Sequence, residues 1–173
     1  LLTASAVERK VTARTRGIMP VHLNGRTAAM DGVLEIARSH SLKIVEDSCQ
    51  ALGSKYKGRF AGTFGTAGTC SFYPSKTLAC FGDGGAVFTD DDAVAVHLRL
   101  LRDHGRGESG DVVVWGYNSR LDNLQAAVLD FKLSRYEAAI ARRRHLARLY
   151  DERLRDLAGL ELPPGPDAAP DPL

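Results

Sequence analysis

Two polar segments in the middle of the chain hold residue types that could do chemistry together. Asp47 and Gln50 follow the apolar run at 42–45, and Ser71 lies within the strand-like run at 69–73. Lys76 comes five positions after Ser71, and a glycine turn at 82–85 follows it. A lysine amine can form a Schiff base, a carboxylate can keep a pyridine nitrogen protonated, and small hydroxyl donors can hold a phosphate. Pyridoxal phosphate (PLP) chemistry requires these residue types.

The elements that must position these residues alternate between strands and helices. An apolar run at 18–21 precedes helical spacing of apolar residues over 30–40, and a second apolar run at 42–45 ends at Glu46 and Asp47. This order predicts βαβ units and a largely parallel sheet, in which functional groups gather at the carboxyl ends of strands. We therefore predict an α/β fold with Asp47 at such an end.

Further elements are expected on either side of this unit. They are a helix over 6–14, loop and short strands over 53–68, strands over 69–73, 86–89 and 112–115, a helix from about Asp92 to Asp103, and a mostly helical stretch over 121–157. Five prolines from Pro163 onward predict an extended linker or the first turn of another domain. The chain begins at Leu1 rather than Met with a pattern already under way, which indicates a fragment.

Composition is that of an ordinary globular protein, with 44% hydrophobic and 25% charged residues. Because 23 basic residues face 21 acidic ones, the net charge of +2 argues against a nucleic-acid partner. No apolar run approaches the roughly 20 residues of a membrane span, and no signal peptide is visible. Cys49, Cys70 and Cys80 form no CxxC pair and favour a reducing compartment, so a cytoplasmic location is expected.

Several familiar motifs are incomplete. Gly105, Gly107 and Gly110 spell GxGxxG, but a helix precedes them and a strand-like run follows, which is the reverse of a dinucleotide site. The histidines show neither HExxH nor His/Cys ligand spacing, so no metal site is expected. The basic run 142–144 is followed by acidic residues on the same helix. This pattern indicates a solvent-exposed helix face rather than a nucleic-acid site.

Sequence context separates Lys76 from a surface lysine and Asp47 from a simple helix cap. The relevant segments are PVHLNG at 20–25, VEDSCQA at 45–51, GTFG at 62–65, SFYPSK at 71–76, GDGGA at 82–86 and GYNSRLD at 116–122. Through these segments the chain resembles the sugar aminotransferases of the DegT/DnrJ/EryC1/StrS group, which are fold-type I PLP enzymes. The segments occur in the family's order and cover nearly the whole chain.

The resemblance implies a role for five residues. Lys76 matches the lysine that holds the cofactor as a Schiff base and moves the proton between the substrate carbon and the cofactor. Asp47 matches the partner of the pyridinium nitrogen, and Gln50 matches a residue near the phenolic oxygen of the ring. Ser71 matches a phosphate ligand. Asn118 matches an asparagine that reaches the phosphate in the neighbouring subunit, which implies a homodimer with shared active sites.

Some positions depart from the family pattern or lack an implied role. Leu52 stands where many relatives have His, and Cys49 replaces a small alanine. His22 and Arg120 lie in matching segments, but no role is assigned to either. The turn that binds phosphate and the aromatic residue that stacks on the ring belong to a region before Leu1, so this fragment alone is expected to be inactive.

The implied fold is a partial fold-type I large domain over 1–130, followed by a connecting helix and the start of the small domain over 131–173. The implied activity is transfer of an amino group from an amino-acid donor, glutamate, to a nucleotide-linked ketosugar, in amino-sugar, polysaccharide or antibiotic biosynthesis. One alternative is a PLP-dependent sugar dehydratase, in which a histidine replaces the lysine, and Lys76 argues against it. The other is a catalytically silent or regulatory homologue of the same fold.

Overall fold

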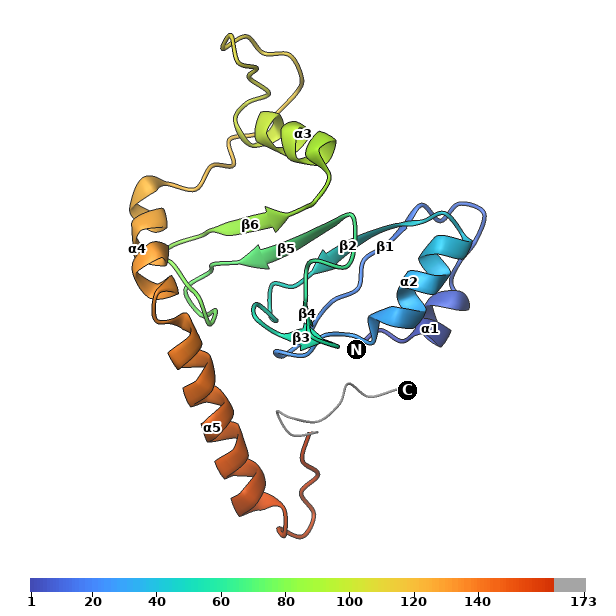
Figure 1. The fold of residues 1–173 in the computed structure, drawn as a ribbon, viewed down its shortest axis with the longest axis vertical. Coiled ribbons are helices and arrows are strands. Elements are labelled where there is room, and N and C mark those ends of the chain that lie inside the picture. The colour runs from blue at the N-terminus through green and yellow to red at the C-terminus, as the bar shows by residue number, and fades with distance from the viewer. Residues whose placement is uncertain (164–173) are drawn as a thin grey trace.

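The computed structural model describes residues 1–163, and a four-stranded sheet with the order β1-β2-β5-β6 forms its centre (Figure 1). The strands are β1 (Gly17–Ile18), β2 (Lys43–Asp47), β5 (Ala67–Ser71) and β6 (Gly85–Phe88). The first three run parallel, and β6 pairs antiparallel with β5. The predicted α/β fold with a mainly parallel sheet is therefore confirmed.

Helix α2 (Met30–Ser39) makes the crossover between β1 and β2. Its buried residues Met30, Val33 and Ala37 pack with Ile44 of β2, because helical spacing places them on one stripe. Tyr56 completes this cluster from a two-stranded hairpin. The hairpin consists of β3 (Lys55–Tyr56) and β4 (Arg59–Phe60), within the segment where short strands were expected.

The amino-terminal helix is shorter than the sequence predicted. Helix α1 spans Ala4–Glu8, with its first turn capped by Thr3, whereas the prediction extended to residue 14. The Thr15 hydroxyl accepts a hydrogen bond from the Thr12 backbone N–H at 2.9 Å, which replaces a helical bond there. Threonine hydroxyls that bond to nearby backbone groups compete with helix formation, and this explains the error.

Two predicted strands also differ in extent. The strand expected at 18–21 is reduced to β1, and only Val21 adds an isolated bridge, to Asp47. Pro20 lies between them and has no N–H for the ladder. The strand expected at 112–115 does not form, and Val112 makes only an isolated bridge to Arg106.

The second half of the described chain carries three helices. They are α3 (Asp92–Arg102), α4 (Asn123–Leu133) and α5 (Tyr136–Leu154). Asp91 caps α3, since its carboxylate accepts bonds from the N–H groups of Ala93 and Val94 at 2.9 and 3.2 Å. The predicted division at residue 130 falls inside α4 and stays a prediction.

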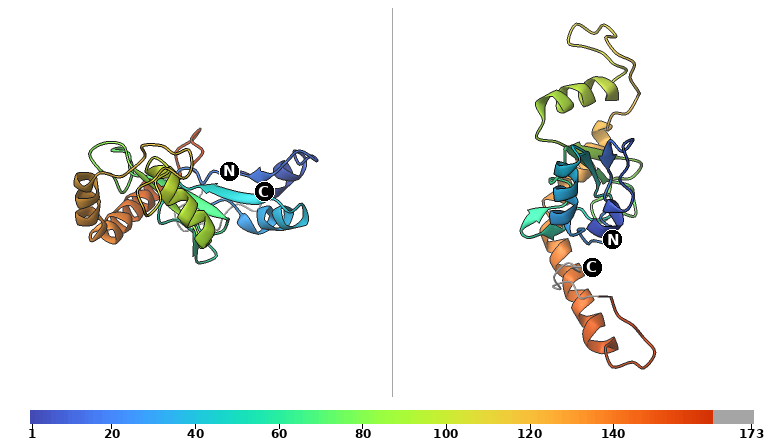
Figure 2. Two further views of the ribbon diagram at one scale, coloured as in Figure 1. Left: turned by 90° about the horizontal axis from the view of Figure 1, so that it is seen from above. Right: turned by 90° about the vertical axis from the view of Figure 1, so that its right-hand side faces the viewer.

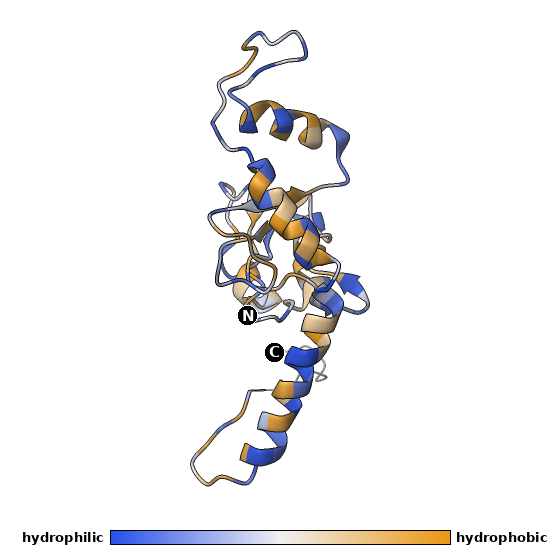
Figure 3. Ribbon diagram, turned by 90° about the vertical axis from the view of Figure 1, so that its left-hand side faces the viewer, coloured by the Kyte–Doolittle hydropathy of each residue, from blue (hydrophilic) through white to orange (hydrophobic). Residues whose placement is uncertain are grey.

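The segment between α3 and α4 and the helix α5 extend away from the sheet in opposite directions (Figures 1 and 2). Figure 3 shows hydrophilic turns along much of α5, which has no buried residue. Within residues 1–163, no helix is long and apolar enough to cross a bilayer. The linker predicted from the prolines falls mainly on 164–173, outside the described residues.

Helix α4 packs against the segment that follows β5. A second buried cluster joins Leu129 of α4 to Leu78 and Cys80. Lys132 donates a hydrogen bond from Nζ to the Ala79 carbonyl at 2.6 Å, and Gln125 accepts one from the Phe81 N–H at 2.8 Å. The segment that contains Lys76 is therefore held between the sheet and α4.

Candidate functional site

Asp47 lies at the carboxyl end of β2, where the sequence places it. Its backbone N–H donates to the Pro20 carbonyl at 3.0 Å, and its carbonyl accepts from the His22 N–H at 2.9 Å. Its Oδ1 atom accepts from the Cys49 N–H at 3.0 Å, and the residue is half-buried. The backbone N–H and carbonyl of Asp47 are thus both bonded to the segment 20–22, which fixes the residue at the carboxyl end of β2.

Ser71 and Lys76 lie at the same edge. Ser71 is the last residue of β5, and its hydroxyl accepts a hydrogen bond from the Tyr73 N–H at 3.2 Å. The Lys76 backbone N–H donates to the Tyr73 carbonyl at 2.9 Å, which closes a turn around the proline at 74. Lys76 itself is half-buried.

The charges of Asp47 and Lys76 both affect the pKa of the Cys49 thiol. Burial raises the pKa of this thiol, and the hydrogen bond with Thr69 opposes that shift. The charge of Asp47 raises the pKa further, and the charge of Lys76 lowers it. Both effects act on a residue just beyond β2, the strand that ends at Asp47.

Gln50 and Asn118 are placed differently. Gln50 is exposed just beyond β2, and its carbonyl accepts a hydrogen bond from the Gly25 N–H at 2.8 Å. Asn118 is exposed in the extension between α3 and α4, where its Oδ1 accepts from Arg120 at 3.2 Å. Arg120 also pairs with Asp103 at 3.3 Å. The structure therefore brings Asp47, Ser71 and Lys76 to one edge and leaves Asn118 on a projecting segment.

The side chains of Asp47, Ser71 and Lys76 fit the chemistry of PLP. Asp47 is half-buried at the end of β2, Ser71 ends the adjacent parallel strand, and the half-buried Lys76 follows it closely in the chain. The amine can bind an aldehyde, the carboxylate can partner a ring nitrogen, and the hydroxyl can donate to a phosphate. Among residues 1–163, no group of three or more His, Cys, Asp or Glu is arranged to hold a metal ion.

The sequence interpretation missed a buried polar network behind Asp47. The Glu46 carboxylate accepts a hydrogen bond from His22 Nε2 at 2.9 Å and from the N–H groups of Gly62, Phe64 and Gly65 at 2.8, 2.6 and 2.7 Å. Both His22 and Glu46 have 0% relative exposure. A glutamate at the core-facing position of a strand, two residues after the buried Ile44, is the signal that could have revealed it.

The hydrogen bonds keep the Glu46 carboxylate ionised. Burial raises its pKa, but the bonds from His22 and from the backbone at Gly65, Gly62 and Phe64 outweigh that effect. The pKa of Glu46 is consequently below its ordinary value of 4.5. Four donors occupy the acceptor positions that an ionised carboxylate offers.

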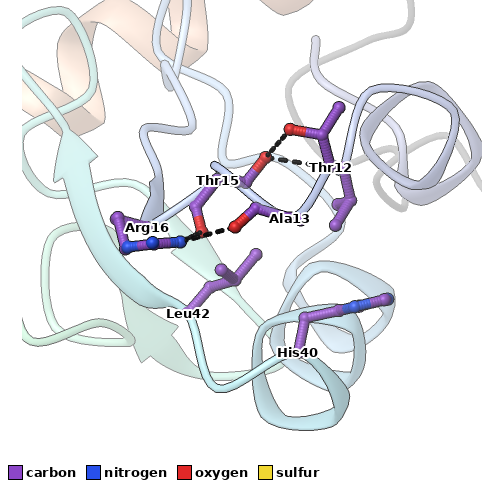
Figure 4. Close-up of a pocket in the computed structure, with 7 residues that line it drawn as sticks. Thr12, Ala13, Thr15, Arg16, His40 and Leu42 are labelled. Carbon is purple, nitrogen blue, oxygen red and sulfur yellow. Dashed lines mark hydrogen bonds between the residues drawn. The ribbon is translucent and has the colours of Figure 1, made fainter.

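A pocket lies at the opposite end of the parallel strands (Figure 4). It is lined by Val11, Thr12, Ala13, Thr15, Arg16, His40 and Leu42. Arg16 and Leu42 immediately precede β1 and β2, so the pocket lies at the amino-terminal strand ends. The Arg16 guanidinium donates to the carbonyls of Ala13 and Thr15 at 2.8 and 3.1 Å. The pocket is therefore separate from the edge that carries Asp47 and Lys76.

Comparison with known proteins decides the family. A sequence model of the DegT/DnrJ/EryC1/StrS aminotransferase family matches residues 1–171. The chain belongs to the DegT/DnrJ/EryC1/StrS aminotransferase family. The family resemblance and the fold class predicted from the sequence are thereby confirmed, and members of this family are PLP-dependent.

Relatives in the DegT/DnrJ/EryC1/StrS family are much longer than this chain. The chain is 46% identical to the dTDP-3-amino-3,4,6-trideoxy-alpha-D-glucose transaminase of Streptomyces venezuelae, covering 95% of this chain and 44% of that protein. It is 43% identical to the pleiotropic regulatory protein of Geobacillus stearothermophilus, covering 88% and 41%. The chain thus spans less than half the length of both relatives.

A solved structure gives the same correspondence in three dimensions. The crystal structure of DesV from S. venezuelae in complex with a ketimine intermediate matches with a TM-score of 0.92 and 45% identity. The match covers 98% of this chain and 46% of that one. The arrangement of sheet and helices described above is therefore that of a DegT/DnrJ/EryC1/StrS family member.

The Glu46 network predicts acid sensitivity. Since the pKa of Glu46 is lowered by folding, its stabilisation is present above the ordinary value of 4.5 and is lost as the pH falls through the lower folded-state pKa. In the full-length protein, Glu46→Gln should cost about 3 kcal/mol at pH 7, because an amide cannot accept all four bonds. Thermal unfolding between pH 7 and pH 3 should show the difference from wild type shrinking.

The exposed helix residue Glu35 provides a matched control, since Glu35→Gln removes the same charge from the surface of α2. This variant should follow the wild-type profile. A constant difference between wild type and Glu46→Gln across this pH range would contradict an ionised, hydrogen-bonded Glu46.

Proposed function

We propose that the full-length protein is a PLP-dependent sugar aminotransferase. It transfers an amino group from glutamate to the keto group of a nucleotide-linked sugar, in amino-sugar, polysaccharide or antibiotic biosynthesis. The observation that carries this proposal is that Asp47 ends β2 and Ser71 ends the parallel strand β5, shortly before Lys76, in a chain of this family. The name of the S. venezuelae relative, a transaminase of a dTDP-linked sugar, supports the substrate class.

The chain supplies several of the groups that would hold PLP. Lys76 holds the cofactor covalently, Asp47 partners the ring nitrogen and Ser71 binds the phosphate. Gln50 lies near the phenolic oxygen of the ring. When bound, PLP supplies an electron sink for the charge that develops on the substrate carbon.

Asp47 and Lys76 have complementary electrostatic tasks in this proposal. An ionised carboxylate next to the ring nitrogen favours its protonated form, so Asp47 maintains the electron-accepting state. Lys76 would be the base that takes the proton from the substrate carbon and later returns it. Half-burial of both side chains limits competition from water.

The active site is proposed to be shared across a homodimer. Asn118 lies on an extension whose apolar side chains are open to solvent, and Trp115 and Tyr117 are 96% and 71% exposed. Large aromatic side chains are enriched in the cores of protein interfaces, and such exposure supports burial by a second copy. Asn118 would then reach the phosphate held by the partner.

A regulatory homologue is the second candidate, because one relative carries the name pleiotropic regulatory protein. The presence of Lys76, Asp47, Gln50 and Ser71 argues for turnover instead. Lys76 also argues against the dehydratase alternative. The three cysteines are all free, which supports a reducing compartment, and we propose the cytoplasm.

Covalent attachment of PLP to Lys76 is the direct test of the function. Borohydride reduction of the full-length protein followed by peptide mapping should place the label on Lys76, since it follows β5 at the edge where Asp47 ends β2. Adding glutamate should bleach the absorption of the bound cofactor, and a panel of nucleotide-linked ketosugars should then restore it. A label on Lys43, Lys55, Lys57 or Lys132 would refute the assignment, and a labelled protein that never bleaches would favour the regulatory candidate.

Asp47→Asn should leave PLP bound and lower the rate of the glutamate half-reaction by about 100-fold or more. A neutral amide cannot hold the ring nitrogen protonated, so the electron sink weakens. Stopped-flow absorption measures the rate. Asp130→Asn, on the exposed side of α4, is the matched control and should stay near wild type. A rate for Asp47→Asn within a few-fold of wild type would exclude the proposed role.

Subunit mixing tests the shared site. Lys76→Ala and Asn118→Ala should each be inactive as homodimers, because each lacks one group of every site. After subunit exchange, the heterodimer carries one site with both wild-type residues and should recover activity. Mass spectrometry of the intact dimer measures the exchange, and proven exchange without recovery would contradict the assignment of Asn118.

A further inference from the structure

His22 and Glu46 are both fully buried, yet neither belongs to the groups proposed to hold PLP. The His22 ring uses both of its nitrogens. Nδ1 accepts a hydrogen bond from the Ala28 N–H at 3.1 Å, so the ring proton is on Nε2, which donates to Glu46 at 2.9 Å. This neutral tautomer satisfies the ring completely and lets one side chain link three segments.

The backbone of His22 adds a link to Asp47. The His22 N–H donates to the Asp47 carbonyl at 2.9 Å, while the His22 ring bonds to the preceding residue, Glu46. Glu46 and Asp47 are successive strand residues, so their side chains point to opposite faces of the sheet. Glu46 is therefore connected to Asp47 through the backbone that they share and through His22.

Glu46 also connects β2 to the entry of β5. Its carboxylate holds three N–H groups of the turn 62–65, which leads into β5. The turn packs closely against β2, since a Cβ atom at Gly65 would lie 2.5 Å from the Ile44 carbonyl oxygen. A Cβ atom at Gly68 would lie 2.1 Å from the Gly62 carbonyl oxygen. The position of β5, which ends at Ser71, therefore depends on this turn.

We propose that Glu46 and His22 are positioning residues that set the Asp47 carboxylate against the Ser71 and Lys76 side of the site. This inference rests on the proposed function. The carboxylate of Glu46 links the segment that follows β1, the end of β2 and the turn before β5. Without this carboxylate, the carboxyl ends of β2 and β5 shift relative to each other. The residues proposed to hold PLP are unchanged in type, but their geometry is altered.

The test uses the full-length enzyme with Glu46→Gln. The amide keeps one acceptor oxygen and places an NH2 group against two of the four donors. Visible-region circular dichroism of the bound cofactor reports how the protein holds it, and the glutamate half-reaction separates rate from apparent affinity. We expect an altered visible band and a rate about 10- to 100-fold lower, since small misplacements of reacting groups cost this much. The apparent affinity for glutamate should change less than the rate.

Val33→Ala is the control for destabilisation alone. Val33 is fully buried in the α2 core cluster and contacts no residue of the site in that cluster. It should lower the unfolding temperature while leaving the visible band and the rate near wild type, measured well below that temperature. An equal spectral change in Val33→Ala, or a wild-type band and rate in Glu46→Gln, would overturn the proposal.

A second pair keeps the test decisive if Glu46→Gln does not fold. His22→Ala removes the donor to Glu46, and His22→Gln restores a side-chain N–H at a similar distance along the side chain. We expect the band and rate to change in His22→Ala and to recover in part in His22→Gln. Equal behaviour of the two variants would overturn the proposal. Failure of the proposed function is distinguishable, because wild type itself would then carry no label on Lys76.

Discussion

A single buried carboxylate connects the parts of this structure that matter most. Glu46 accepts four hydrogen bonds, three of them from backbone N–H groups of one turn and one from His22. A buried charge is costly unless its acceptor positions are filled, and here they are filled. None of the four donors lies on β2, which carries Glu46. The network can therefore form only when the strands have reached their final places.

The site is also supported from the other side. Leu129 of α4 packs on Leu78 and Cys80, and the Lys132 amine contacts the Ala79 carbonyl. The Tyr136 hydroxyl at the start of α5 donates to the Leu52 carbonyl at 2.8 Å, close to the end of β2. The segment with Lys76 thus lies between the carboxyl ends of the parallel strands and the helices α4 and α5.

Errors in the predicted elements have identifiable physical causes. Helix α1 stops early because the Thr12 backbone bonds to the Thr15 hydroxyl, a local competition that apolar spacing does not reveal. The apolar run at 112–115 was taken for a strand, but it lies on an extension with no neighbouring strand, where Trp115 is almost wholly exposed. An apolar run predicts that its side chains are buried, but it does not show whether residues of the same chain bury them.

The sequence by itself determined the α/β class, the order of the main elements and the family, because hydrophobic periodicity and short motifs are local properties. It also placed Asp47 at the end of a strand and Lys76 after the next parallel one. Only the tertiary structure decided that β2 and β5 are neighbours, so that Asp47 and Ser71 end at one edge, that Asn118 lies on a projecting segment, and that His22 and Glu46 form a buried network. The reason is that strand pairing, burial and hydrogen-bond partners depend on residues distant in the chain, and no local pattern records which distant groups will meet.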